Sequence, residues 1–236
     1  MSTYLWIDLG AVLLPLLFTF HPRLRFHERW RVFWPALALM MALFLPWDIA
    51  FTARGVWSFA PEHCCGLRVL GLPVEEWLFF LCVPYACVFT YHAFQALGVK
   101  DHFGRAATGI SVALVLLGLA VGLTHMDRAY TSTAFLALAA WTAFAAFVLK
   151  APWLGRFYFT YLVLQVPFLI VNGLLTGTGL HTPVVRYNDA DQLGLRLGTI
   201  PVEDTFYGLV MVGLTVMFYE LLSARRSTGT GLPVPQ

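Results

Sequence analysis

Charged residues are scarce in this sequence, and its cysteines follow no ligand motif. Only 12% of the 236 residues are charged, whereas 59% are hydrophobic. This balance excludes an ordinary soluble domain and indicates a polytopic membrane protein. The net charge of +2 is too small to suggest nucleic-acid binding. The four cysteines have no zinc-ligand spacing, so we interpret them as packing residues: Cys64, Cys65, Cys82 and Cys87.

Further absences narrow the functional classes. The only lysines, Lys100 and Lys150, fall between apolar runs, which excludes a retinal-binding seven-helix protein with a lysine in its last span. No Asp-x-x-Asp or Asp-x-x-x-Asp run stands at a span end to hold magnesium and diphosphate, as a prenyltransferase would need. No Gly-x-Gly-x-x-Gly turn follows a strand, so the dinucleotide-binding fingerprint is missing. We therefore predict neither a metal nor a cofactor.

What the sequence does contain is a series of apolar runs long enough to cross a bilayer. We predict an all-α integral membrane protein with about seven transmembrane helices. The first run has no basic region before it and no small-residue cleavage site after it, so we expect a span rather than a signal peptide. The expected spans are Tyr4–Phe20, Val32–Phe51, Val74–Phe94, Thr108–His125, Ser132–Leu149, Phe157–Thr176 and Val202–Leu222.

The basic residues predict the orientation in the membrane. The connection of residues 21–31 is the most basic stretch, and under the positive-inside rule it lies in the cytoplasm. We therefore expect a protein that is integral to the cell membrane, with its N-terminus outside and its C-terminus in the cytoplasm. The membrane that we expect is a bacterial inner membrane. Alternating sides place ten of the 15 lysines and arginines in the cytoplasm, namely Arg23, Arg25, Arg29, Arg31, Lys100, Arg105, Lys150, Arg156, Arg225 and Arg226. The outer five are Arg54, Arg68, Arg128, Arg186 and Arg196.

One short motif occurs twice. Pro73-Val74-Glu75-Glu76 opens the third span, and Pro201-Val202-Glu203-Asp204 opens the seventh. An acid in a first helical turn complements the helix dipole and can simply mark a helix start, but that effect does not require the same neighbours twice. Carboxylates at the mouth of a membrane helix are costly to bury, so the duplication indicates a functional site.

The duplicated motif also predicts the domain organisation. Aligning its copies sets spans one to three against spans five to seven, with the fourth span between them. Because a three-span unit ends on the side opposite its start, this extra crossing lets both units face the same way. We expect two parallel three-helix repeats joined by a linking helix (3+1+3). The units are residues 1–97, the linker 98–130, residues 131–223 and a polar C-terminal tail at 224–236.

The predicted catalytic residues are the four motif acids, Glu75, Glu76, Glu203 and Asp204. Adjacent helical residues point about 100° apart, so the two acids of a pair cannot share one face. An aromatic follows the first acid by four residues in both copies, Phe79 after Glu75 and Tyr207 after Glu203. We therefore favour the first acids as the reactive carboxyls and the second acids as partners that orient or perturb them.

Aromatic residues near these acids suit an uncharged hydrocarbon that reacts through a carbocation, since ring faces stabilise cations without trapping them. Aromatics also form belts at span ends, so only some of them are expected to line a site. Asp48 and Asn172 occupy loosely matching places in the repeats, although polar side chains there often hydrogen-bond between helices. The predicted substrate-binding residues are Trp47, Asp48, Trp77, Phe79, Asn172, Phe206 and Tyr207.

Because of its two Pro-Val-Glu-acid motifs, the chain resembles the membrane-integral lycopene cyclases of the fused two-repeat type. The signature of that family is Pro-x-Glu-(Glu/Asp) in each half. The resemblance covers essentially the whole chain. It implies a lycopene β-cyclase, an intramolecular lyase or isomerase that needs no redox cofactor. In that reaction a carboxylic acid protonates the end group of lycopene or a related linear carotenoid, and the resulting cation closes a ring. A base then removes a proton, giving γ-carotene, β-carotene or both.

Two other functions are left open by the residues. Another carotenoid end-group enzyme, a hydratase or a long-chain carotenoid cyclase, would share the protonation step. A small 3+1+3 proton-coupled transporter would instead use the acids for coupling. The expected partners are the carotenoid and membrane lipid, with no nucleic acid; a homo-oligomer or association with other carotenoid-pathway enzymes is left open. The sequence also leaves open how many rings are formed, whether they are of the β or ε type, and whether the two acid pairs form one site or two.

Overall fold

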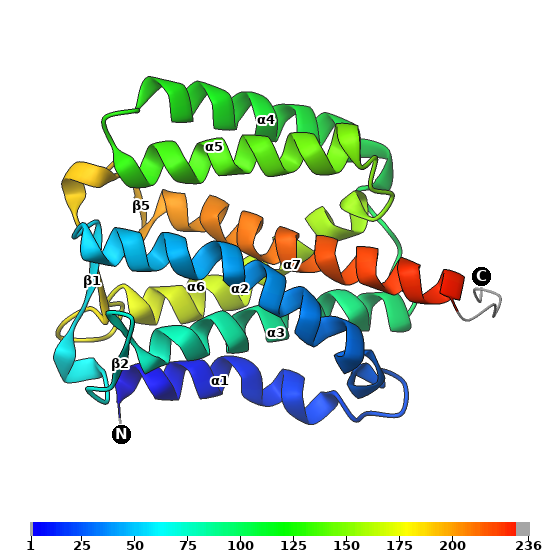
Figure 1. The fold of residues 1–236 in the computed structure, drawn as a ribbon, viewed down its shortest axis with the longest axis horizontal. Coiled ribbons are helices and arrows are strands. Elements are labelled where there is room, and N and C mark those ends of the chain that lie inside the picture. Colours follow the sequence, from blue (N-terminus) through cyan, green and yellow to red (C-terminus); the bar gives the residue numbers. More distant parts are fainter. Residues whose placement is uncertain (1, 230–236) are drawn as a thin grey trace.

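The computed structural model describes residues 2–229, with side chains described through Arg225. Seven α-helices run side by side along the long axis (Figure 1). Within the described residues, six helices are long and apolar enough to cross a membrane, and α1 is apolar but shorter, with 16 residues. The predicted all-α membrane fold is thus confirmed. The helices are α1 (Thr3–Phe18), α2 (Trp30–Ala53), α3 (Val74–Ala96), α4 (Ala107–Thr124), α5 (Ala129–Ala143), α6 (Leu154–Leu175) and α7 (Val202–Gly229).

The helix boundaries follow the apolar runs, with two differences of note. The helices α3 and α7 begin at Val74 and Val202 as predicted, although Pro73, the first residue of the motif, lies outside α3 as its extended N-cap (φ −62°, ψ 148°). At its other end, α7 continues through Gly229, so the first residues of the predicted polar tail are helical. The rest of that tail, 230–236, lies outside the described residues.

Short strands gather at the end of the bundle where the N-terminus lies, which we call the strand end (Figure 1). Strand β1 (Trp57–Phe59) pairs antiparallel with β4 (Val185–Tyr187), so one strand comes from the loop before each motif helix. Two hairpins lead into α3 and α7: β2 (Arg68–Val69) with β3 (Leu72–Pro73), and β5 (Arg196–Leu197) with β6 (Ile200–Pro201). The loops before the two motifs differ in sequence, yet they end in equivalent hairpins.

Single turns of 3₁₀-helix and one π-helical segment complete the secondary structure. The π-helical segment η4 prolongs α5 to Val148 and completes the predicted fifth span. The 3₁₀ turns are η1 (Phe26–Arg29), η2 (Pro61–His63), η3 (Gly104–Ala106) and η5 (Asp189–Asp191), and η4 covers Phe144–Val148.

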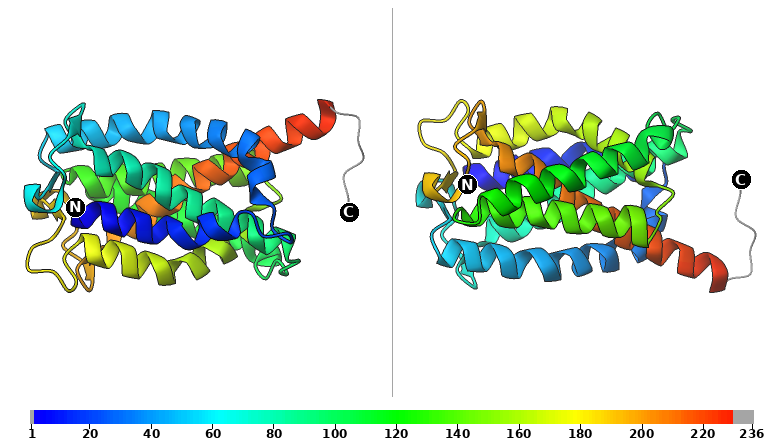
Figure 2. Two further views of the ribbon diagram at one scale, coloured as in Figure 1. Left: turned by 90° about the horizontal axis from the view of Figure 1, so that it is seen from below. Right: turned by 90° about the horizontal axis from the view of Figure 1, so that it is seen from above.

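The helix packing crosses between the two halves of the chain. Helix α1 packs on α3 as α5 packs on α7, whereas α2 packs on α7 and α6 packs on α3. Each motif helix is therefore covered by the middle helix of the other half. Helices α1 and α4 lie on opposite sides of the bundle (Figure 2). Helix α4 packs closely on α5, because Gly118 leaves no room for a side chain: an added Cβ would lie 2.5 Å from the Phe135 carbonyl oxygen.

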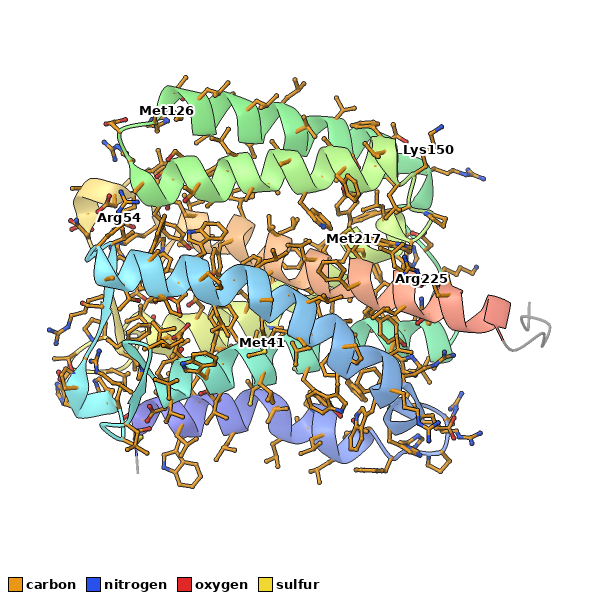
Figure 3. The ribbon with its side chains drawn as sticks, viewed as in Figure 1. Met41, Arg54, Met126, Lys150, Met217 and Arg225 are labelled. Carbon is orange, nitrogen blue, oxygen red and sulfur yellow. The ribbon has the colours of Figure 1, made fainter. Side chains whose placement is uncertain are left out.

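The basic residues separate toward the two ends of the bundle. Arg54, predicted to lie outside, is at the strand end, whereas Lys150 and Arg225, predicted to be cytoplasmic, are at the opposite end (Figure 3). The helix ends therefore alternate between the two sides as the sequence pattern requires.

Candidate active site

An apolar cavity lies inside the bundle toward the strand end. It encloses about 1090 Å³, including space continuous with the surroundings. Its lining comes from α1, α2 and α3 with β1 in the first half, and from α5, α6 and α7 with β4 in the second. The crossed packing of the halves therefore makes one cavity rather than two. Three carboxyl side chains face it: Asp48, Glu76 and Asp204.

Glu76 is the second acid of the first motif, and it is held by one phenol. The Tyr4 hydroxyl at the start of α1 donates a hydrogen bond to Glu76 Oε2. Asp48 on α2 lines the same cavity, so a second carboxyl faces the same apolar space. Asp48 accepts a hydrogen bond from the indole Nε1 of Trp57 on β1 at 2.6 Å. Within this described pocket, Glu76 thus has a like-charged neighbour and a single side-chain donor.

Asp204 is the second acid of the other motif, and it is surrounded by three donors. The Tyr130 hydroxyl donates to Oδ1 at 2.5 Å, while Asn172 Nδ2 and the Tyr187 hydroxyl donate to Oδ2 at 2.8 and 2.9 Å. Burial, together with the nearby Asp204 charge, raises the pKa of the Tyr187 phenol, so this loop tyrosine remains a donor. Hydrogen bonds donated to a carboxylate stabilise its charged form.

The first acids of the motifs hold the preceding loops instead of facing the cavity. Glu75 Oε1 accepts the Cys65 backbone N–H at 2.6 Å, and Glu203 Oε1 accepts that of Leu193 at 2.7 Å, ten residues back in both halves. The Thr131 hydroxyl also donates to Glu203, at 2.6 Å. Neither first acid lines the cavity. The structure therefore places the second acids, and not the favoured first acids, against the cavity.

Four of the seven predicted substrate-binding residues line this cavity: Asp48, Phe79, Asn172 and Tyr207. The other three face neighbouring elements. Trp47 packs behind Tyr207, with ring centroids 5.1 Å apart, and Trp77 Nε1 donates to the Val69 carbonyl in the hairpin. Phe206 packs on Phe135 of α5, with ring centroids 4.7 Å apart. Each of these three lies one or two positions from a lining residue, and the helical turn of about 100° per residue carries it to another face.

Several tyrosines of the site were missed by the sequence analysis. Tyr4 precedes Glu76 by 72 residues and Tyr130 precedes Asp204 by 74, so both open the first helix of their half. This repeated tyrosine was a readable signal, because it recurs at almost the same distance from the second acid. Tyr187 had no such signal, since its loop has no counterpart in sequence in the other half.

Aromatic rings crowd around the carboxyls. Trp57 and Tyr130 meet edge to face with centroids 5.2 Å apart, and Tyr130 stacks on Tyr187 at 5.8 Å. Tyr207 contacts both Trp57 and Tyr130, at 6.4 and 6.1 Å. We call these four residues the aromatic cluster. Its members line the cavity, and aromatic ring faces are groups that attract positive charge.

No group of three His, Cys, Asp or Glu side chains in the described part of the chain is arranged to hold a metal ion. The cysteines nearest the first motif lie in its loop. Burial raises the pKa of the Cys64 thiol to about 11, and the nearby Glu75 adds to this rise. The thiol therefore stays protonated at neutral pH and offers no thiolate ligand or nucleophile.

The fold and the site define an all-α membrane protein with one apolar, carboxylate-lined cavity shared by two similar halves. A comparison with protein families agrees, since the lycopene cyclase family profile matches residues 1–94 and 127–222. The chain belongs to the lycopene cyclase family.

The relatives it matches are longer fungal proteins. It is 25% identical to a bifunctional lycopene cyclase/phytoene synthase of Aspergillus niger over 189 residues, which cover 73% of this chain and 31% of the relative. Identity to the protein of the same description from Neurospora crassa is 31%, over 46% of this chain and 21% of the relative. The chain thus spans about a third or less of the length of these relatives. No solved structure matches it.

Proposed function

We propose that this chain is a lycopene β-cyclase that isomerises a linear carotenoid end group to a β-ionone ring without a redox cofactor. The observation that supports this most is that one apolar cavity receives the second acid of both motifs in two different hydrogen-bonding environments. Cyclisation needs a proton donor and a proton acceptor at the same hydrocarbon, and two carboxyls in unequal surroundings can divide these roles. The two halves then share a single site.

Glu76 is the proton donor in this proposal. Two carboxyls that share an apolar cavity cannot both be ionised without a large electrostatic cost, so one proton stays on the Asp48–Glu76 side. Asp48 accepts the short Trp57 hydrogen bond, which favours its charged form. Glu76, with a single phenol donor, is therefore the carboxyl that keeps the proton. A protonated carboxyl beside a hydrocarbon can act as a general acid.

Asp204 is the proton acceptor. Its three donors stabilise the carboxylate, so it remains ionised while Glu76 is protonated. Asn172 stands at the position in the second half that corresponds to Asp48 in the first half. Because its amide is uncharged and donates to Asp204, Asp204 has no like-charged neighbour at this position.

The reaction then transfers one proton in and one proton out. Glu76 donates its proton to the terminal carbon–carbon double bond of the end group and leaves a tertiary cation. The electron pair of a more internal double bond closes the six-membered ring and moves the positive charge to a ring carbon. Asp204 removes a proton from the adjacent carbon, and the electrons of that C–H bond form the ring double bond. Atoms and electrons balance without an oxidant or a reductant.

The remaining walls of the cavity protect the cation. Faces of the aromatic cluster stabilise positive charge without offering a nucleophile. The paired strands β1 and β4 contribute Trp57, Phe59, Val185 and Tyr187 to the lining at the strand end. This cover limits access of water, which would otherwise capture the cation as an alcohol, the outcome expected of a hydratase.

We also propose the predicted domain organisation and orientation for this chain. The equivalent hairpins before α3 and α7 and the crossed packing of α2 and α6 support two repeats, residues 1–97 and 131–223, joined by residues 98–130. The excess of basic residues at the end opposite the strands supports a cytoplasmic location for that end. The acids then lie near the outer side of the cell membrane, and lycopene enters from the lipid.

Expression in a lycopene-accumulating bacterial host tests this proposal. The unaltered chain should convert lycopene to a monocyclic or bicyclic carotene, which chromatography and absorption spectra identify. Glu76→Gln and Asp204→Asn should each lower conversion by about 10²–10⁴-fold, the usual contribution of a general acid or base. Unchanged lycopene in cells that contain the folded, unaltered protein would reject the cyclase assignment.

Incubation of each purified variant in lipid vesicles with unlabelled lycopene in D₂O separates the two carboxyl roles. In Asp204→Asn, Glu76 still protonates the end group, and the cation reverts by losing a proton, so recovered lycopene should carry deuterium. In Glu76→Gln, no proton is delivered and recovered lycopene should carry none. The opposite pattern would exchange the acid and the base, and an alcohol product would favour a hydratase.

A further inference from the structure

Asp8 is a buried carboxyl that neither motif explains. It lies on α1 in the middle of an apolar run, and its side chain is fully buried, at 0% exposure. Neither carboxyl oxygen has a hydrogen-bond partner among the described residues. A charged carboxyl in such a place is very costly, whereas a protonated one costs much less. Since an unpaired polar group adds nothing to stability, Asp8 calls for a functional explanation.

The position of Asp8 connects the acid half of the site to the outer loop. It follows Tyr4 by one helical turn, so the two side chains lie on the same face of α1. Asp8 interacts electrostatically with Tyr4, Glu75 and Glu76. Glu75 has one buried oxygen without a partner, and its other oxygen accepts the backbone N–H of the exposed Cys65. Asp8 thus lies close enough to interact electrostatically with both the loop-bonded Glu75 and Tyr4, although no hydrogen bond joins it to either residue in the described part of the chain.

The second half lacks this feature. The residue one turn after Tyr130, in the place that Asp8 holds after Tyr4, is Ala134, which is fully buried. The first acid of that half, Glu203, also has one buried oxygen without a partner among the described residues, but its other oxygen accepts the Thr131 hydroxyl in addition to the loop amide. Among the described residues, a buried acid with both oxygens unpartnered therefore occurs beside Glu76 and not beside Asp204, although the hairpins and helix contacts around the two acids are similar.

We propose that Asp8 is a proton-relay residue that recharges Glu76 after each turnover, an inference that rests on the proposed role of Glu76 as the acid. When Glu76 has lost its proton, the Tyr4 phenol passes its own proton to the Glu76 carboxylate. The Asp8 carboxyl, which has no hydrogen-bond partner in the resting structure, then turns to the phenol oxygen and gives it a proton. Water at the outer loop then returns a proton to Asp8 by way of Glu75, while Asp204 releases the proton that it removed from the ring. One proton enters and one leaves, so the cycle balances.

An infrared measurement tests the resting state without any turnover. The purified protein in lipid vesicles should show a carboxylic acid C=O band that is absent from Asp8→Asn and that shifts in D₂O. Asp8→Glu should restore it. A spectrum of Asp8→Asn identical to that of the unaltered protein overturns the proposal, because Asp8 would then hold no proton. This result is independent of whether lycopene is the substrate.

Turnover measurements test the relay itself. With enzyme in excess over lycopene, Asp8→Asn should close the first ring at the normal rate, because Glu76 already holds its proton. With lycopene in excess, its rate should fall about tenfold or more, and Asp8→Glu should recover most of it. Equal losses in both regimes, or no loss in the second, overturn the relay. Failure of the unaltered protein to cyclise lycopene in either regime rejects the proposed function, so the two failures are distinguishable.

Discussion

The two halves of this molecule share a scaffold and differ in what surrounds their second acids. Both halves have an equivalent hairpin, a first acid bonded to a loop amide and a tyrosine that donates to the second acid. Around Glu76 the structure adds two further carboxyls, Asp48 and Asp8, whereas around Asp204 it adds the donors of Asn172 and Tyr187. In the proposed reaction, these different neighbours give the two matching acids opposite roles, Glu76 as the proton donor and Asp204 as the proton acceptor.

A second difference concerns the shape of the cavity. The residue four positions after the second acid is Phe80 in the first half and Gly208 in the second. Phe80 is fully buried in the core, but Gly208 lines the cavity. The cavity extends along α7 past Gly208 to Met211 and Val212, and along α3 to Val83, Ala86 and Cys87. The two motif helices differ at one position, where Gly208 opens space that Phe80 does not. A single elongated hydrocarbon suits this asymmetric space better than two equivalent ligands would.

Among variants that leave the carboxyls of the site in place, filling the space beside Gly208 is expected to have the largest effect. Gly208→Leu should lower lycopene conversion at least tenfold while the protein still folds, because the new side chain occupies room that the hydrocarbon needs. A Cβ at this position already lies 3.0 Å from the Tyr161 hydroxyl, so a longer side chain must enter the cavity. Carotene formation in vesicles, measured over a range of lycopene contents, gives the rate and the apparent affinity.

Gly10→Leu is the matched control for this variant. Gly10 is exposed on α1, and an added Cβ there meets no atom within 4 Å. The control should therefore retain full conversion. Equal activity of Gly208→Leu and Gly10→Leu would mean that the substrate does not use the space along α7.

Removing the matching tyrosine hydroxyls should give smaller and unequal effects. In Tyr4→Phe, Glu76 loses the only side-chain donor described for it, whereas in Tyr130→Phe, Asp204 keeps the bonds of Asn172 and Tyr187. A hydrogen bond to a charged group is worth about 1.5–3 kcal/mol, so Tyr4→Phe should slow steady-state cyclisation by roughly tenfold or more. Tyr130→Phe should slow it only a few-fold, since two donors remain.

Rates of the two variants, measured side by side in vesicles with equal amounts of folded protein, check this comparison. A larger loss in Tyr130→Phe than in Tyr4→Phe would contradict the unequal support of the two acids. It would place the more sensitive proton step at Asp204.

The sequence predicted the fold well because membrane helices are long apolar runs bounded by polar or Gly/Pro residues. It predicted the four motif acids as the candidate group, and it favoured the first acid of each pair, whereas the second acids are the ones that line the cavity. Phe79 and Tyr207 stand four residues after the first acids and three after the second, and both spacings bring side chains together on a helix. The spacing alone could not show which acid of each pair faces the cavity. The loop amides that bind the first acids lie ten residues away, so no helical pattern indicates them.

Other parts of the site depend on long-range contacts or were overlooked. The pairing of β1 with β4 brings Trp57 and Tyr187 to the carboxyls, and nothing local in either loop indicates that contact. Asp8, in contrast, was visible as the only acid in the first apolar run. An ionisable residue within a membrane span is a functional candidate in its own right.

The smallest expected effect on activity belongs to the first acids, and Glu203→Gln tests it most cleanly because no unpaired carboxyl like Asp8 lies beside Glu203. Glutamine keeps an oxygen that can accept the Leu193 N–H and the Thr131 hydroxyl, but it removes the charge that strengthens both bonds. The free energy of unfolding should fall by about 1–2 kcal/mol, which lowers Tm by a few degrees in a chain of this size. Cyclisation by the folded fraction should change by less than about threefold, since Asp204 and its three donors remain in place.

Thermal unfolding in detergent measures the stability of Glu203→Gln, and carotene formation at low temperature measures its activity. A variant with the normal Tm but no cyclisation would return the catalytic role to the first acid, and the difference between the halves would then lie in the loops rather than in the cavity.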